Sequence, residues 1–103
     1  MKKSKYTIRF NKLFGDKLKD RKKSTLAKFF KIEKKYLDEV FDRGLAAARN
    51  TGMRPGVTSP TQWASARLYK YLLNVYDYRR GKKLNRGPGQ DSDLVLKALN
   101  KKI

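Results

Sequence analysis

Residues 50–80, NTGMRPGVTSPTQWASARLYKYLLNVYDYRR, hold the only Trp of the chain and two of its three prolines. The second half of this stretch begins with residues that are typical of a helix N-terminus. Ser59 can cap the helix, Pro60 suits the first helical position because it lacks a backbone N–H, and Gln62 can complete a capping box. The stretch therefore predicts a helix that starts at residue 60.

The first half of the same stretch predicts the end of an earlier helix, followed by a turn. Gly52 can adopt the left-handed conformation that closes a helix, and Pro55 prevents the helix from continuing. Arg54, Pro55 and Gly56 then turn the chain. A phosphate-binding loop is the alternative, because Gly52, Gly56 and the amides after Ser59 could surround an anion. We favour the structural interpretation, since the turn signals fully account for these residues.

The helix predicted over residues 60–78 is the expected centre of the core. Its main apolar stripe is Ala64, Leu68, Tyr71, Leu72, Val75 and Tyr78, widened by Trp63, Tyr69 and Tyr76. Arg67 lies one helical turn after Trp63, which favours a cation–π contact between the two, or an ion pair of Arg67 with Asp91 or Asp93. Phosphate binding by Arg67 is the alternative.

Three further helices are expected around it. One starts near Ser24 or Thr25, either of which can be the N-cap. A second spans residues 33–49, where Gly44 lies on the apolar stripe and would let another helix approach closely. A short third helix follows Asp91 and Asp93, whose carboxylates suit a helix start. The chain is thus predicted to be mainly α, a small single-domain bundle of three or four helices.

Residues 24–44, STLAKFFKIEKKYLDEVFDRG, resemble a helix-turn-helix motif. The connection near residues 32–34 has the right length, although Lys31 replaces the usual turn glycine. Two amphipathic helices of an ordinary bundle give the same apolar spacing, so both interpretations stay open. Glu33, Asp38 and Glu39 on the exposed face of the second helix disfavour sequence-specific reading, because carboxylates repel the DNA backbone.

Residues 1–23 are expected to form a basic N-terminal arm, distinct from a helical domain over residues 24–103. Within the arm, YTIRF alternates as a short strand or extended segment does, with Tyr6, Ile8 and Phe10 on one side. Two interpretations stay open for this arm: a disordered tail, or a segment that becomes ordered against nucleic acid or a neighbouring subunit.

The charge of the chain predicts an anionic partner. With 27 Lys and Arg against 9 Asp and Glu, the net charge is +18 over 103 residues, and such a chain repels itself. Nucleic acid is favoured over an anionic membrane or an acidic protein, because neutralised phosphates release counterions. No apolar run is long enough to span a membrane or to form a signal peptide, so a soluble, unexported protein is expected.

The same composition argues against catalysis. Cys and His are both absent, which excludes thiolate nucleophiles, imidazole bases and the usual zinc sites. No glycine-rich phosphate loop or HExxH-type motif occurs. We therefore expect a protein that is not an enzyme and that has no metal site and no cofactor.

The cations expected to contact double-stranded DNA, mostly without sequence specificity, or another anionic surface lie in four places: the arm, the start of the helix over residues 33–49, the end of the long helix and the irregular loop 81–89. They are Lys2, Lys3, Lys5, Arg9, Lys12, Lys22, Lys23, Lys34, Lys35, Arg79, Arg80, Lys82, Lys83 and Arg86.

Four short motifs occur in order along the chain: RGLAA at 43–47, TGMRPGVT at 51–58, QWASAR at 62–67 and DSDL at 91–94. Together they resemble a small domain of unknown function from large double-stranded DNA viruses of algae and amoebae and from tailed phages of marine bacteria. The resemblance spans residues 26–94 and departs from the family pattern at Ala48 and Met53. Its signature residues are Gly44, Gly52, Arg54, Pro55, Gly56, Ser59, Pro60, Gln62, Trp63, Arg67, Asp91 and Asp93.

The resemblance implies a viral setting and supplies no activity. In that setting we expect a structural protein of the virion, a minor capsid or internal protein that bridges other capsid proteins and packaged DNA. It would be located in the virion and, during assembly, in the host cytoplasm or nucleus. The alternative is a helix-turn-helix DNA-binding regulator or a genome-compacting protein.

Overall fold

The computed structural model describes residues 5–20, 22–51, 60–86 and 91–99, and these residues are mainly helical, with no strand among them. The elements are α1 (Lys5–Phe14), the 3-10 helix η1 (Gly15–Lys17), α2 (Lys23–Phe30), α3 (Lys34–Thr51), α4 (Pro60–Arg79) and α5 (Ser92–Ala98). The predicted fold class, a mainly α bundle in one domain, is confirmed, although three or four helices were expected and the described residues form five α-helices. The signature residues Gly52, Arg54, Pro55, Gly56 and Ser59 lie outside the described residues.

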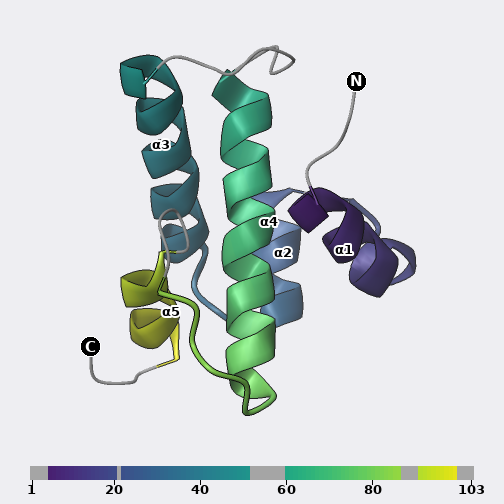
Figure 1. Ribbon diagram of the computed structural model, residues 1–103. Coiled ribbons are helices and arrows are strands. Elements are labelled where there is room, and N and C mark those ends of the chain that lie inside the picture. The colour runs from purple at the N-terminus through teal and green to yellow at the C-terminus, as the bar shows by residue number, and fades with distance from the viewer. Residues whose placement is uncertain (1–4, 21, 52–59, 87–90, 100–103) are drawn as a thin grey trace.

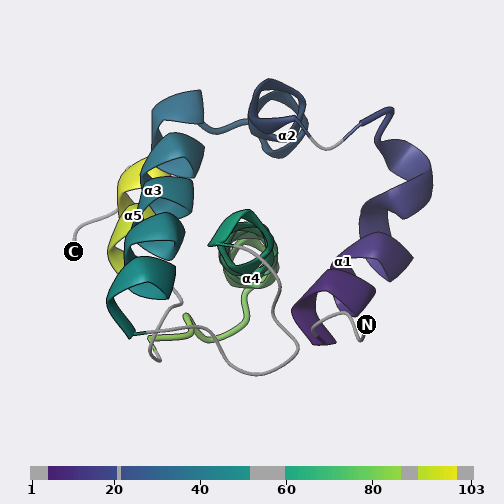
Figure 2. The same cartoon turned by 90° about the horizontal axis from the view of Figure 1, so that it is seen from above.

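The helix α4 is the centre of the bundle, as the sequence predicted. Figure 2 shows α1, α2 and α3 standing around it, and α5 packs against α3 and α4. Residues 71–75 of α4 are all buried, and they cover more than one helical turn, so this part of α4 is enclosed on every side. Pro60 is the first residue of the helix, as its missing N–H favours.

Close approach of α3 to α4 depends on Gly44. A Cβ atom at this position would lie 2.7 Å from the Cα of Ala64 and 3.0 Å from its Cβ. Both distances are too short for two carbon atoms, and the Ala64 backbone cannot move aside as the end of a flexible side chain can. The expectation that Gly44 admits a second helix is therefore confirmed, and that helix is α4.

The N-terminal segment forms the helix α1, whereas the sequence pattern predicted a strand or extended arm. Tyr6, Phe10 and Phe14 share one face of a helix because they are four positions apart. Phe10 is fully buried, and its ring stacks on Tyr69 of α4 with centroids 4.7 Å apart. Ile8, which a strand would place beside Tyr6 and Phe10, is 56% exposed. An alternation over five residues cannot separate a period of two from one of 3.6.

The buried side chains of this segment belong to the core of the domain. Phe10, Phe14 and Leu18 form one apolar cluster with residues of the other helices. The ring of Phe14 meets Phe30 of α2 and Tyr76 of α4 edge to face, with centroids 5.1 Å apart in both pairs. Much of the segment expected to be an arm therefore packs against α2 and α4 (Figure 1).

The helix α2 starts slightly earlier than predicted. Its N-cap position is Lys22, so Ser24 and Thr25 lie inside the first turn and neither is the N-cap. Asp20 supports this start, because its carboxylate accepts a hydrogen bond from the backbone N–H of Lys22 at 2.9 Å. That hydrogen bond, together with one from the Thr25 side chain, lowers the pKa of Asp20.

A short turn at residues 31–33 joins α2 to α3. Lys31 adopts a left-handed conformation with a φ of 58°, the conformation that a glycine usually supplies there. The backbone N–H groups of Lys31 and Ile32 donate back to carbonyls of α2. The guanidinium of Arg79, from α4, donates to the carbonyls of Phe30 and Lys31. Arg79 therefore holds the turn, and its guanidinium is committed to a structural contact.

The last predicted helix is confirmed as α5. Asp91 occupies its N-cap position with a φ of 52°, but its side chain makes no cap hydrogen bond to the helix. The hydroxyl of Tyr71 in α4 donates to the carbonyl of Leu94 in α5 at 3.0 Å. Burial raises the pKa of the Tyr71 hydroxyl. This hydrogen bond ties α5 to the centre of the bundle.

We predict that Gly44→Ala destabilises the protein by about 2 kcal/mol, because the added methyl group forces α3 and α4 apart. Helix propensity acts in the opposite direction by about 1 kcal/mol, so the steric term must exceed it. The exposed residue Ala46 provides the control, since Ala46→Gly should cost only the propensity term of about 1 kcal/mol. Urea denaturation measures both, and a G44A variant more stable than the wild type would contradict the close contact.

Candidate nucleic-acid interface

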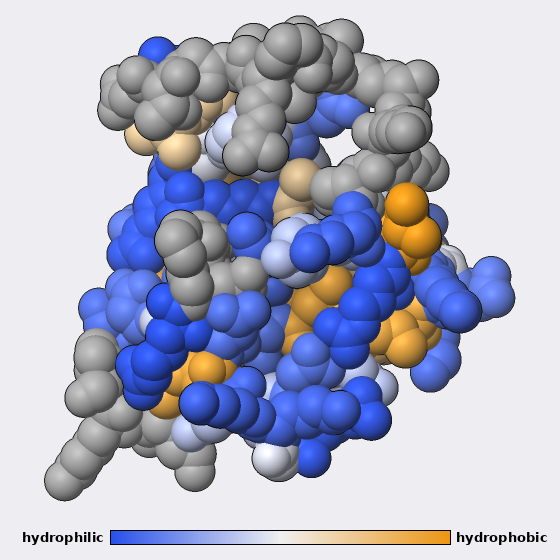
Figure 3. All heavy atoms as spheres, in the orientation of Figure 1, coloured by the Kyte–Doolittle hydropathy of each residue, from blue (hydrophilic) through white to orange (hydrophobic). Residues whose placement is uncertain are grey.

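Most carboxylates form ion pairs with cations of the same chain. Within the described residues, six of the nine Asp and Glu residues form an ion pair with Lys or Arg, namely Glu33, Asp38, Glu39, Asp77, Asp91 and Asp93. The cations outside these pairs are therefore opposed by few negative groups. Figure 3 shows one face of the molecule, where hydrophilic side chains cover most of the described surface.

The most buried ion pairs link three helices. The Asp91 carboxylate, whose side chain is 1% exposed, lies 3.0 Å from a nitrogen of Arg43 in α3 and 2.9 Å from one of Arg67 in α4. Asp93 accepts two further hydrogen bonds from Arg43. The hydrogen bonds between Arg43 and Asp93 lower the pKa of Asp93 and raise that of Arg43. The predicted ion pair of Arg67 is confirmed with Asp91, and this cluster is structural.

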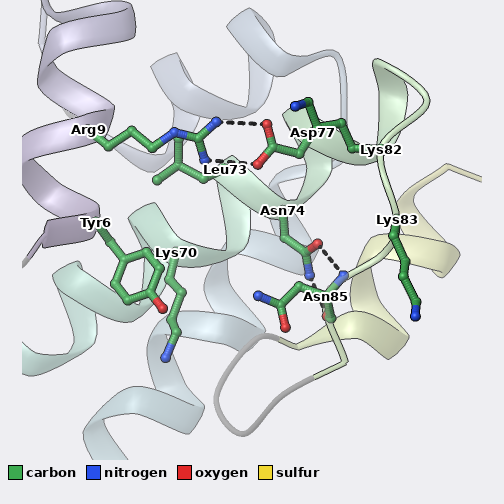
Figure 4. Close-up of a pocket in the computed structure, with 9 residues that line it drawn as sticks. All are labelled: Tyr6, Arg9, Lys70, Leu73, Asn74, Asp77, Lys82, Lys83 and Asn85. Atoms are coloured by element: carbon green, nitrogen blue, oxygen red, sulfur yellow. Dashed lines mark hydrogen bonds and ion pairs between the residues drawn. The ribbon is translucent and has the colours of Figure 1, made fainter.

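A shallow groove lies between α1, α4 and the loop that follows α4 (Figure 4). It has a volume of about 320 Å³. The side chains come from positions far apart in the sequence, and four of the nine are cationic. The lining residues are Tyr6, Arg9, Lys70, Leu73, Asn74, Asp77, Lys82, Lys83 and Asn85.

One bidentate ion pair fixes α1 to α4 beside this groove. The guanidinium of Arg9 donates two hydrogen bonds to the two carboxylate oxygens of Asp77, each 2.8 Å long. These bonds lower the pKa of Asp77 and raise that of Arg9. Asp77 also lies 3.9 Å from Arg80, whose guanidinium packs over the ring of Tyr76. The single carboxylate of the groove is thus neutralised by its neighbours.

The loop at residues 82–86 is held firmly against α4. The buried side chain of Asn74 donates to the carbonyl of Asn85 at 2.9 Å and accepts from its N–H at 3.1 Å. Leu84, which directly precedes Asn85, is buried, whereas Lys82 and Lys83 are exposed. The loop therefore presents its two lysines on a backbone that is already ordered.

On the opposite wall, the ring of Tyr6 organises cations. The ammonium group of Lys70 lies 4.8 Å from the ring centroid, and that of Lys5 lies 5.3 Å from it. A cation over an aromatic face is attracted by the electron-rich face of the ring quadrupole. Tyr6 therefore contributes to the groove mainly by positioning positive charge.

The remaining predicted contact residues lie elsewhere. Lys34 and Lys35 at the start of α3 form ion pairs with Asp38 and Glu33, and the Glu33 carboxylate raises the pKa of Lys35. Lys23 lies over the ring of Phe41. The exposed residues Lys12, Lys22 and Arg86 do not line the groove, and Lys2 and Lys3 lie outside the described residues. Of the predicted contact residues, the structure gathers Arg9, Lys82 and Lys83 at one groove.

Sequence reasoning missed Arg43, Asn74 and Asp77. Arg43 stands in the RG motif, whose charge is opposite to that of the DSD motif, and this complementarity was the signal for their contact. Asn74 interrupts the apolar run of α4, which is typical of a buried polar residue with a specific partner. Asp77 is the only acidic residue of α4, but its partner Arg9 is 68 positions away, so no local pattern connects the two.

The described residues form a small, basic, helical single-domain protein. The chain belongs to a family of unknown function, DUF5824, which matches residues 1–94. The match includes α1, whereas the resemblance in the sequence was expected to begin at residue 26. Comparison with curated proteins and with solved structures gave no match. Among the described helices, none has the length and apolar character needed to cross a membrane.

We predict that Asp91→Ala destabilises the protein by about 3 kcal/mol, because it leaves the guanidinium groups of Arg43 and Arg67 without their buried partner. The control is Asp42→Ala on the exposed face of α3, which should change the free energy of unfolding by less than about 0.5 kcal/mol. Thermal and urea denaturation measure both. Equal stability of the two variants would show that the cluster does not hold α5 in place.

Proposed function

We propose that this protein is a non-enzymatic structural component of a virus particle that binds packaged double-stranded DNA without sequence specificity. The observation that carries the proposal is the distribution of charge. Within the described residues, six of nine carboxylates are paired internally, while the net charge is +18. Most of the described lysines are exposed, and with few unpaired carboxylates near them they favour a polyanion.

Double-stranded DNA fits this surface better than a membrane does. The described surface combines exposed lysines with only two large exposed apolar side chains, Ile8 and Phe29, whereas a membrane-bound helix needs an extended apolar face. A duplex offers closely spaced phosphates, and each one that a lysine neutralises releases counterions. Binding of this kind depends on charge density and requires no base contacts.

The viral setting rests on the resemblance of the RG, TG, QWA and DSD motifs to a viral domain. In a particle, a small basic domain can lie between the protein shell and the genome and reduce the repulsion between packed DNA segments. Other capsid proteins would be its second class of partner. This setting favours a minor capsid or internal protein over an enzyme.

A helix-turn-helix DNA-binding protein is the second candidate. It is favoured by the three-residue connection between α2 and α3 and by the left-handed Lys31, which takes the conformation of the usual turn glycine. Against it, Lys34 and Lys35 are engaged by Asp38 and Glu33 at the start of α3. The helix that would enter the major groove therefore presents little net positive charge.

We predict salt-dependent binding of duplex DNA. Fluorescence anisotropy with labelled duplexes of two unrelated sequences should give similar affinities. For six or more phosphate contacts, both affinities should fall by about 10³-fold between 50 and 200 mM salt. Replacing Lys34 and Lys35 with Glu should leave most of the binding. No binding by the wild type would overturn the proposal, and loss of binding in the K34E/K35E variant would move the contact to α3 and support the second candidate.

The structural role predicts a fixed copy number in purified particles. Quantitative mass spectrometry of particles of the virus that encodes the chain should detect it in intact particles, and also in emptied particles if it contacts the shell. Recovery only with the released genome would favour a compacting protein. Absence from every fraction would overturn the virion role without affecting DNA binding in solution.

A further inference from the structure

We infer that the groove between α1, α4 and residues 82–85 is the site that holds the DNA backbone, and that the Arg9–Asp77 ion pair prepares it for phosphate. This inference rests on the proposed binding of DNA and specifies where and how it occurs. The groove combines Arg9, Lys70, Lys82 and Lys83 with one carboxylate, that of Asp77. Its cations come from three elements that only the folded chain brings together (Figure 4).

Asp77 carries the one carboxylate among the residues that line the groove. An unpaired Asp77 would repel a phosphate entering the groove and would cancel part of the attraction of the lysines. Arg9 neutralises it through two hydrogen bonds of 2.8 Å, the geometry in which a guanidinium binds a carboxylate most strongly. Arg9 is therefore a positioning residue. It neutralises the Asp77 carboxylate and keeps α1 in place along one side of the groove.

Two lysines lie on the loop that lines the groove. Lys82 and Lys83 are carried by a loop that Asn74 fixes through both of its amide atoms. The N–H of Lys82 also donates to the backbone carbonyl of Asp77 at 3.0 Å. Because the backbone of the loop is ordered before binding, little conformational entropy is lost when its lysines contact phosphate.

The aromatic ring of the groove favours contact with the phosphate backbone over contact with the bases. A protein that binds single strands stacks bases on exposed aromatic rings. In this groove the aromatic ring is that of Tyr6, and the ammonium groups of Lys5 and Lys70 lie within 5.3 Å and 4.8 Å of its centroid. The ring thus holds cations where a base would stack. The groove is suited to the phosphates of a duplex.

The test replaces Lys82 and Lys83 with Gln and compares the variant with K28Q/K97Q, which removes the same charge from exposed positions of α2 and α5 that do not line the groove. For K82Q/K83Q, the slope of log affinity against log salt should become shallower by about 2, since each phosphate contact contributes about 0.9. For K28Q/K97Q the slope should stay at the wild-type value.

Equal slopes for the two variants, with normal binding by the wild type, would overturn the groove and leave the proposed function intact. Absence of wild-type binding would overturn the proposed function itself. A single-stranded oligonucleotide of the same sequence provides a further comparison. Tighter binding of the single strand than of the duplex at equal salt would contradict a backbone site for double-stranded DNA.

The role of Arg9 is tested with a charge-restoring pair. Arg9→Gln leaves Asp77 unpaired in the groove and should weaken DNA binding, whereas R9Q/D77N has the net charge of the wild type and should recover most of the affinity. The buried Phe10 and Phe14 keep α1 packed in both variants, which circular dichroism and thermal denaturation can verify. Binding by folded R9Q/D77N that stays as weak as that of R9Q would overturn neutralisation of Asp77 as the role of Arg9.

Discussion

The enclosure of α4 is the constraint on which the rest of the structure depends. A helix whose residues 71–75 are all buried needs neighbours on every side, and this chain supplies them from both ends of its sequence. Because Gly44 has no Cβ, the backbone of α3 can pack closely against Ala64 of α4. Phe10 and Phe14 bring α1 to another side. The α5 helix is tied in by the Tyr71 hydroxyl.

The charge distribution follows from the same packing. A chain of net charge +18 repels itself, and the fold offsets this repulsion by placing its few carboxylates where several cations meet. Asp91 joins Arg43 and Arg67, and Asp77 joins Arg9 and Arg80. Both acidic residues are thereby used for holding helices together. The positive charge that is left over lies on the surface, where it becomes the basis of the proposed DNA binding.

The two proposed modes of DNA binding place the contact on different parts of one bundle. The helix-turn-helix interpretation uses α2 and α3, a pair close in sequence that a motif search can find. The groove uses α1, α4 and the 82–86 loop, which are distant in sequence and meet only in the folded chain. The internal pairing of Lys34 and Lys35 and the ordered loop around Lys82 and Lys83 favour the groove.

The sequence alone determined the helical class, a helix that starts near residue 24, the helices over about 33–49 and 60–78 and after Asp91, and the close approach at Gly44. It also offered the ion pair of Arg67 as one of its alternatives. Helical periodicity, capping residues and motif charges are local or regularly spaced signals. It predicted the wrong conformation for the N-terminal segment, since YTIRF is short enough to fit a strand as well as a helix. The tertiary structure decided that α1 packs on α4, that Arg9 meets Asp77, and that Arg9, Lys70, Lys82 and Lys83 share a groove. These contacts depend on burial against a distant helix, and no local pattern encodes which distant partner a residue will meet.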